Sequence, residues 1–353
     1  MFNLTASTQL LKPAAAAAEP ASQTRHEWLD FAKGFCMLAV VMLYSANEAE
    51  RVLGSAGWMQ YWVDFAQPFR MPDFFLLSGL LLSKVINKPW RHYADRKIAH
   101  YLYFYLLWSV ISLGLLALGG RFANLSHMNI VNTLIGALLV WPYKQLWFIL
   151  MLPAYFLLTR LARGLPVWLV FAVLCLVHLM PPPDAGLILI ASFFKFFVFF
   201  YAGYAFAPAL LRMASFLQQH RTVAVVGLLV WIALNGTLVA QGFTQYLPVV
   251  LLLGFLGTAA VMASSALLHA TAGFRWIGYL GSHTLAIYLP FSWMMLAASS
   301  ITRQLMPAPD PGLFAAGITV LAILGSLTLY WGTRRTGVAS WLFSRPRWAR
   351  IAP

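Results

Sequence analysis

Residues 33–48 read KGFCMLAVVMLYSANE, an apolar stretch that opens with a lysine and closes with polar side chains. With its neighbours it is long enough to cross a bilayer as a helix, which takes about 20 residues. The whole chain has this character, because 61% of its 353 residues are hydrophobic, 10% are charged and the mean hydropathy is +0.74. These values lie far outside the range of soluble domains. The sequence therefore predicts an integral membrane protein.

Apolar stretches of similar length recur along the chain, and they predict an all-α fold, a polytopic membrane helical bundle of about ten transmembrane helices. The expected helices lie near residues 29–46, 62–86, 98–119, 146–162, 165–180, 187–208, 223–240, 246–268, 280–299 and 312–332. Pro68 and Pro72 interrupt the second of them. A shorter apolar piece, Ile130 to Trp141, is read as an interfacial or re-entrant segment.

Basic residues test this arrangement, because lysine and arginine concentrate in cytoplasmic loops. With the N-terminus inside, most of the 24 basic residues fall on the inner side. The pattern predicts that both termini are cytoplasmic. It also accounts for the formal charge of +14 without a nucleic-acid partner.

The two ends of the chain differ from the middle. Residues 1–28 are polar and alanine-rich, which predicts a disordered cytoplasmic tail. A secretory signal peptide is the alternative, but the basic leader and apolar core of such a peptide are missing. Residues 29–332 form the expected transmembrane domain, and residues 333–353 a basic cytoplasmic tail.

Several common chemistries leave no trace in the sequence. Cys36 and Cys175 both lie in apolar spans and are expected to pack as small hydrophobic residues. Neither a metal-binding pattern, nor a glycine-rich nucleotide loop, nor a GxSxG motif is present. We therefore expect no bound cofactor.

Four polar residues share one face of the first helix. At about 100° per residue, Asp30, Lys33, Tyr44 and Glu48 fall within about 60° of one another. A polar stripe on a membrane helix faces the protein interior or a watery cavity. Taken singly, Lys33 also fits a cytoplasmic anchor and Tyr44 an interfacial aromatic residue.

The stretch FRMPDFFLLSGL at 69–80 places Arg70 and Asp73 within a helix that prolines interrupt. A buried arginine in a membrane protein must be paired or solvated. One hypothesis is an ion pair between Arg70 and Asp73 that fixes the break. The other is that irregular backbone at membrane depth marks a cavity lined for a substrate.

Six motifs follow one another in a familiar order: LDFAKGFCMLAVVMLYS, FRMPDFFLLSG, KPWRHYADRK, LWFI, FFKFFVFFYAGY and LGSHTLAIYL. In this order they resemble the acyltransferase-3 family of bacterial inner-membrane O-acyltransferases, from Trp28 to about Trp331. The resemblance implies ten helices and a donor that is typically cytoplasmic acyl-CoA. It also implies a hydroxyl acceptor on a carbohydrate or another envelope molecule.

The family's first helix carries a basic residue, ten intervening residues and a histidine that is thought to act as the base. Here these positions are Lys33 and Tyr44. Tyrosine, with a pKa near 10, is a poorer base at pH 7 than histidine, with a pKa near 6.5. Three explanations stay open: Glu48 is the base and Tyr44 donates to the oxyanion, another histidine enters the site, or the chemistry is lost. The candidate histidines are His100, His178 and His283.

The resemblance also suggests binding residues. The donor's phosphates are expected at Lys88, Arg91, Arg96 and Lys97, beside Lys84, with Trp90 and Tyr93 available for stacking. Contact with anionic lipid is the alternative reading of this basic cluster. Lys195, flanked by phenylalanines, could neutralise a phosphate or an oxyanion, or extend to an interface.

Trp147 and Tyr288 are candidates through the resemblance alone. The catalytic candidates are thus Tyr44, Glu48 and Lys33, and the substrate-binding candidates are Asp30, Arg70, Asp73, Lys195, Trp147 and Tyr288. The expected activity is transfer of a short acyl group from acyl-CoA to a hydroxyl acceptor, with membrane lipids as neighbours. The alternative is an altered member of the family that acts as a carrier, a flippase or a structural partner in envelope biosynthesis.

Overall fold

The structure is a computed structural model, and it describes residues 27–119, 136, 142–181, 188–305 and 309–351. Helices connected by short turns make up this part of the chain, which contains no strand. The longer helices are α1 (Glu27–Leu53), α2 (Met59–Ala66), α3 (Arg70–Leu82), α5 (His100–Leu118), α7 (Trp147–Leu161), α8 (Val167–Leu179), α9 (Ile188–Ala205), α10 (Ala207–Gln219), α11 (Arg221–Ala240), α12 (Leu247–Leu268), α13 (Arg275–Ser282), α15 (Phe291–Leu305) and α16 (Pro311–Thr336). The shorter elements are α4 (Trp90–Tyr93), η1 (Ala94–Ala99), η2 (Lys144–Leu146), η3 (Ala162–Gly164), η5 (Phe243–Gln245), η6 (Ala272–Phe274), α14 (Thr284–Tyr288), η7 (Ser340–Leu342) and η8 (Arg347–Ala349).

Within the described residues, six helical segments are long and apolar enough to cross a membrane. They are Glu27–Leu53, Trp90–Leu118, Lys144–Gly164, Arg221–Ala240, Leu247–Leu268 and Pro311–Thr336. A seventh span is formed if α9 and α10, which meet at a bend of 76°, are taken together. The multi-pass, all-helical character is confirmed, whereas the count of ten and the cytoplasmic termini stay predictions.

The remaining expected spans differ from single long helices. The span expected at 62–86 is divided into α2 and α3, because Pro68 lies in the turn between them. The span expected at 280–299 is divided among α13, α14 and α15, with Pro290 just before α15. The helix expected at 165–180 is α8, which has only 13 residues. Of the segment Ile130 to Trp141 only Gly136 is described, and of the N-terminal tail only residues 27 and 28.

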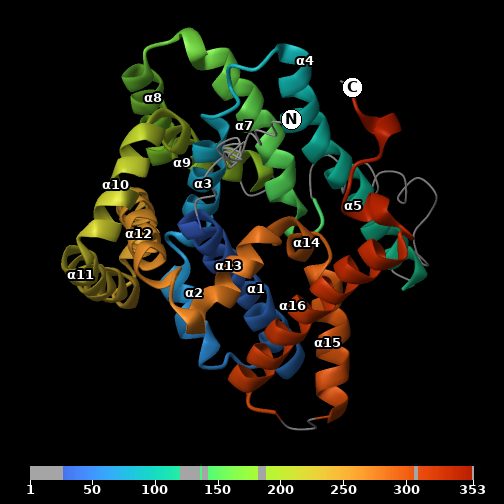
Figure 1. The fold of residues 1–353 in the computed structure, drawn as a ribbon. Helices are drawn as coiled ribbons and strands as arrows, with labels where there is room; N and C mark the ends of the chain where they lie inside the picture. Colours follow the sequence, from blue (N-terminus) through green and yellow to red (C-terminus); the bar gives the residue numbers. More distant parts are fainter. Residues whose placement is uncertain (1–26, 120–135, 137–141, 182–187, 306–308, 352–353) are drawn as a thin grey trace, which may run out of the picture.

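The long helix α1 runs through the centre of the bundle, and α13 crosses it closely (Figure 1). Two glycines permit this approach. A Cβ atom on Gly34 would lie 1.8 Å from the carbonyl oxygen of Ile277, and one on Gly281 would lie 1.6 Å from that of Asp30. Only glycine fits at either position, so the backbones of α1 and α13 are in direct contact.

A second close crossing joins α3 to α9. Gly79 of α3 packs against the backbone of Phe200, and Gly203 of α9 packs against that of Leu76. The aromatic residues of α9 then stack on α3 and α7, as where the rings of Phe75 and Phe196 lie 5.3 Å apart. These contacts hold α3, and with it Arg70 at its N-terminal end, at a fixed position beside α1.

The chain ends in a segment that folds back onto η1 and α5. Arg345 forms a buried ion pair with Asp95 of η1 at 2.5 Å, and the amide of Ile351 donates to the same carboxylate at 2.6 Å. The indole of Trp108 in α5 donates to the carbonyl of Leu342. The described part of the expected basic tail is therefore packed against the bundle (Figure 1).

Candidate functional site

A cavity of about 130 Å³ lies beside Tyr44, where α1, α3, the start of α7 and α14 meet. Apolar and aromatic side chains form most of its wall, and the polar atoms come from a few residues. The lining residues are Val40, Leu43, Tyr44, Met71, Phe74, Gln145, Trp147, Phe148 and Tyr288. The structure thus brings together Tyr44, Trp147 and Tyr288, three candidates from three separate motifs.

Tyr44 is held by its neighbours on two sides. Its ring meets that of Phe291 edge to face, with centroids 5.4 Å apart. The indole of Trp147 is positioned to donate a hydrogen bond to the phenol oxygen. The phenol hydrogen of Tyr44 therefore remains available for another acceptor.

Arg70 is only 6% exposed and lies close enough to the Tyr44 phenol to act on it electrostatically. One guanidinium N–H donates to the carbonyl of Val63 at 3.2 Å, while Nε has no hydrogen-bond partner among the described residues. Among the described residues, the Arg70 guanidinium forms no ion pair with Asp73. The break between α2 and α3 is therefore not fixed by such a pair. A buried positive charge thus stands beside Tyr44.

Asp73 lies in a different place, on the far side of α3 from this cavity's lining. The side chain is 1% exposed and sits near Cys36 of α1 and Thr258 of α12. The Thr258 hydroxyl donates to the carbonyl of Gly254, and both carboxyl oxygens of Asp73 lack a hydrogen-bond partner in the described structure. Asp73 therefore packs at a junction of three helices.

Gln145 is a cavity residue that the sequence reasoning missed. Its side-chain amide donates to the carbonyls of Tyr288 at 3.3 Å and Leu289 at 3.4 Å, and its backbone carbonyl accepts a hydrogen bond from the Tyr288 hydroxyl. The preceding residue, Lys144, has a left-handed backbone with φ of 42°. Such a conformation costs a non-glycine residue about 1 kcal/mol or more, so the turn is held by its surroundings. The position next to the LWFI motif was the available signal.

Glu48 is buried, but it does not line the cavity. Both carboxylate oxygens accept hydrogen bonds from Arg51, one from Nε at 3.0 Å. Lys144 also lies within electrostatic reach of this carboxylate. The Glu48 carboxylate is thus bound by Arg51 and lies near Lys144, at the C-terminal end of α1.

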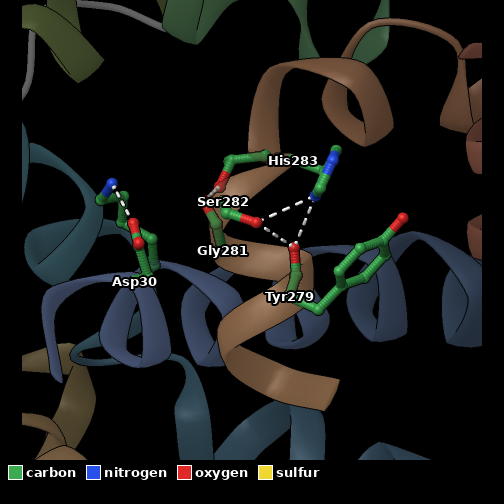
Figure 2. A network of polar contacts seen from close by, with 7 residues as sticks. Asp30, Tyr279, Gly281, Ser282 and His283 are labelled. Atoms are coloured by element: carbon green, nitrogen blue, oxygen red, sulfur yellow. Dashed lines mark hydrogen bonds and ion pairs between the residues drawn. The ribbon is translucent and has the colours of Figure 1, made fainter. Parts of the chain in front are cut away.

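The N-terminal end of α1 borders a second, larger cavity of about 500 Å³. Figure 2 shows part of its wall, with Asp30 on α1 beside Gly281 and Ser282 at the end of α13. Lys33 donates to Asp30 at 2.9 Å. The lining residues are Glu27, Asp30, Phe31, His269, Ala270, Arg275, Gly278, Tyr279 and Ser282. Lys33 and Asp30 thus form an ion pair well separated along α1 from Tyr44.

The three candidate histidines lie elsewhere. His100 packs edge to face on Phe104, and Nδ1 of His178 lies 2.8 Å from the carbonyl oxygen of Lys195. His283 stacks on the ring of Tyr279, with Nδ1 near Ser282 and the Tyr279 carbonyl (Figure 2). The described lining of the Tyr44 cavity contains no histidine.

The expected donor-binding cluster lies between α3 and α5. Lys88, Arg91 and Arg96 are exposed, while Lys97 is half-buried and lies 4.9 Å from the centroid of the Phe156 ring. Arg160 of α7 occupies faces of Trp90 and Tyr93, at 4.7 and 4.2 Å from their centroids. The three exposed cations are accessible to phosphate groups. One face of each ring, Trp90 and Tyr93, already contacts Arg160 and is not available for stacking.

Lys195 is half-buried in α9, with Nζ 5.7 Å from the centroid of the Phe196 ring. The ring of Trp147, which lines the cavity, lies 5.8 Å from that of Phe196. Lys195 therefore contacts a ring that neighbours the Tyr44 cavity but is not among the residues that line it.

Comparison with known protein families gives one match that covers most of the chain. The model of the acyltransferase-3 family, described as an acyltransferase domain, matches residues 26–331. The comparisons with curated proteins and with solved structures gave no match.

Proposed function

Since the chain belongs to the acyltransferase-3 family, we propose that it transfers a short acyl group from acyl-CoA to a hydroxyl of an envelope carbohydrate or a related acceptor. The family assignment makes it a membrane acyltransferase in general terms. The donor, the acceptor, the O-acylation and a place in the bacterial inner membrane are parts of the proposal.

One observation supports this function above the others: Tyr44 lines a small, mainly apolar cavity, and the buried guanidinium of Arg70 lies close to its phenol. Since Trp147 is positioned to donate to the phenol oxygen, the phenol O–H can donate to a carbonyl oxygen that becomes negative. Arg70 adds a fixed positive charge nearby. A cavity of about 130 Å³ suits an acyl group of a few carbons.

The proposed reaction joins the acceptor to the acyl carbon and releases the thiol. The acceptor oxygen attacks the thioester carbonyl, the carbon–sulfur bond breaks, and the hydroxyl proton ends on the leaving sulfur. Tyr44 and Arg70 stabilise the oxyanion of the intermediate. Glu48 can act as base only after Arg51 releases it, so in the arrangement described here Tyr44 acts as a hydrogen-bond donor.

The donor would lie along α3. Its phosphates would meet Lys88, Arg91, Arg96 and Lys97, and about 16 Å of helix separates Met71 in the cavity from Leu82 at that end of α3. An extended donor arm is needed to cover this distance. We assign no contact with the donor or acceptor to Lys33, Asp30, Asp73 or Lys195 in this arrangement.

A second candidate function has its own observation in favour. The described lining of the Tyr44 cavity contains neither a carboxylate nor a histidine to act as base. An altered member of the family that carries or flips an acylated or lipid-linked molecule would need none.

Membranes containing wild type, Tyr44→His, Tyr44→Phe or Glu48→Gln should be assayed for acyl transfer from radiolabelled acetyl-CoA to added envelope glycans. The proposal expects transfer by wild type and strong loss in Tyr44→Phe at equal protein accumulation. It also expects Glu48→Gln to retain transfer, whereas loss in this variant would make Glu48 the base. If wild type shows no acyl transfer and Tyr44→His restores it, the result would favour an altered family member that acts as a carrier.

A further inference from the structure

Gln145 presents an unused hydrogen-bond acceptor to the Tyr44 cavity. The residue is 2% exposed and lines the cavity, and its Oε1 has no hydrogen-bond partner within the described residues. A buried amide oxygen without a partner is unfavourable, since it has given up its bonds to water. The cavity is therefore complementary to a group that brings a hydrogen-bond donor.

The amide is held in place before any ligand arrives. Its Nε2 donates to the carbonyls of Tyr288 and Leu289, and these bonds fix which way Oε1 points. The hydroxyl of Tyr288 donates back to the Gln145 carbonyl, and the left-handed backbone of Lys144 sets the turn. A preorganised acceptor loses little freedom on binding.

The charges around the cavity select the kind of donor. Arg70 acts on the Tyr44 phenol, and Asp64, which acts on the same guanidinium, is not among the cavity's lining residues, which include no acid in the described structure. A protonated amine would therefore be repelled, whereas a neutral hydroxyl would not. A hydroxyl also has lone pairs, and these can face the guanidinium.

We propose that Gln145 is an acceptor-binding residue, whose Oε1 receives the hydrogen bond of a neutral hydroxyl and turns the hydroxyl oxygen toward the site of attack beside Tyr44. This assignment rests on the proposed acyl transfer for its role in the reaction, but the binding itself is independent of the donor. Gln145 thereby determines that the acceptor is an alcohol and not an amine.

The test uses purified full-length protein in lipid nanodiscs with methyl glucoside as a neutral hydroxyl probe and methyl glucosaminide as its amine counterpart. Binding is measured as the shift in the thermal unfolding midpoint with probe concentration. Gln145→Met removes the acceptor and the amide donors, Gln145→Glu keeps an acceptor oxygen, and the exposed Gln219→Met is the matched control.

We expect methyl glucoside to shift wild type and Gln219→Met alike, and to require about tenfold higher concentration with Gln145→Met. The amine probe should bind wild type more weakly than the glucoside, and Gln145→Glu, which places a negative charge beside the amine, should reverse this order. An unchanged order in Gln145→Glu would mean that the side-chain oxygen at position 145 does not face the probe, and would overturn the assignment. So would unchanged binding by Gln145→Met, or no shift of wild type.

Acyl transfer from acetyl-CoA to methyl glucoside is measured in parallel. Gln145→Met should raise the KM for the glucoside about tenfold, with a smaller change in kcat. If wild type transfers nothing while glucoside binding still depends on Gln145, the proposed function fails and the binding assignment stands.

Discussion

The two cavities along α1 differ in size and in polarity. The one beside Tyr44 measures about 130 Å³ and is mainly aromatic, while the one beside Asp30 measures about 500 Å³ and contains charges of both signs. Both are bounded by α1 and by the segment from α13 to α14. The helix α1 therefore contributes to two environments suited to different tasks.

The difference indicates where acyl transfer is expected. A small site with a mainly apolar lining strengthens the interaction of Tyr44 and Arg70 with a developing oxyanion. At the larger cavity, the lining residue Asp30 is already neutralised by Lys33, and both side chains are partly exposed, so their charges are screened. The Tyr44 cavity is therefore the better place for chemistry.

The largest effect is expected where the two cavities share a support. Gly281→Leu would push a side chain into the backbone of Asp30, and neither helix can yield without separating α1 from α13. We expect loss of folded protein, measured as membrane accumulation and as a monodisperse peak in detergent. Gly278→Ala on the same helix, where a Cβ has open space, should accumulate normally. Normal accumulation of Gly281→Leu would disprove the close crossing.

Tyr44→Phe tests whether acyl transfer takes place in the Tyr44 cavity and not in the larger one. Loss of one oxyanion donor lowers kcat by about 100-fold or more, while the ring keeps its contact with Phe291. Initial rates of acyl transfer by purified protein measure the effect, and the exposed Tyr246→Phe is the control. Wild-type rates in Tyr44→Phe would remove Tyr44 from the chemistry.

Trp147→Phe should have a smaller effect on the same reaction. The variant removes the indole N–H that lies near the Tyr44 phenol oxygen, and loss of one neutral hydrogen bond corresponds to about a 2- to 12-fold change. The rate of transfer should fall by that factor, with the exposed Trp168→Phe unchanged. If the rate falls as far as in Tyr44→Phe, Trp147 would have a role beyond orientation.

The smallest effect is expected from Asp30→Asn. A partly exposed i,i+3 ion pair contributes about 1 kcal/mol or less, so the thermal midpoint should change little. Acyl transfer should change by less than about threefold, because Asp30 lies outside the Tyr44 cavity. A loss comparable with that of Tyr44→Phe would move the chemistry to the larger cavity.

The sequence predicted the parts of this arrangement that depend on motif order and on hydropathy. Tyr44, Trp147 and Tyr288 belong to separate sequence motifs, and they line one cavity. Arg70 was expected beside a helix break, and it begins α3 directly after the turn that contains Pro68. Apolar runs and prolines act locally, so they can be read without the fold.

What the sequence could not supply was the choice of partner for each polar group. Helical spacing placed Glu48 on the face of Tyr44, yet Arg51, three residues later, binds it. Gln145 lies in a short turn that has no hydrophobic periodicity. The orientation of its side-chain amide depends on Tyr288, which is 143 residues away. The Arg51 contact is local, but helical spacing alone does not show whether Glu48 turns to Arg51 or to Tyr44. The Gln145 contact follows from tertiary packing, which the sequence pattern does not encode locally.

The ion pair between Asp95 and Arg345 has a consequence for folding during synthesis. Asp95 precedes its partner Arg345 by 250 residues, which at 5–20 residues per second is a delay of roughly 10–50 s. During that interval the η1 segment is in the membrane without the residues that later anchor it. The η1 segment therefore gains this anchor only after the helices between residues 100 and 336 have been synthesised, and a chain that stops before Arg345 lacks the ion pair.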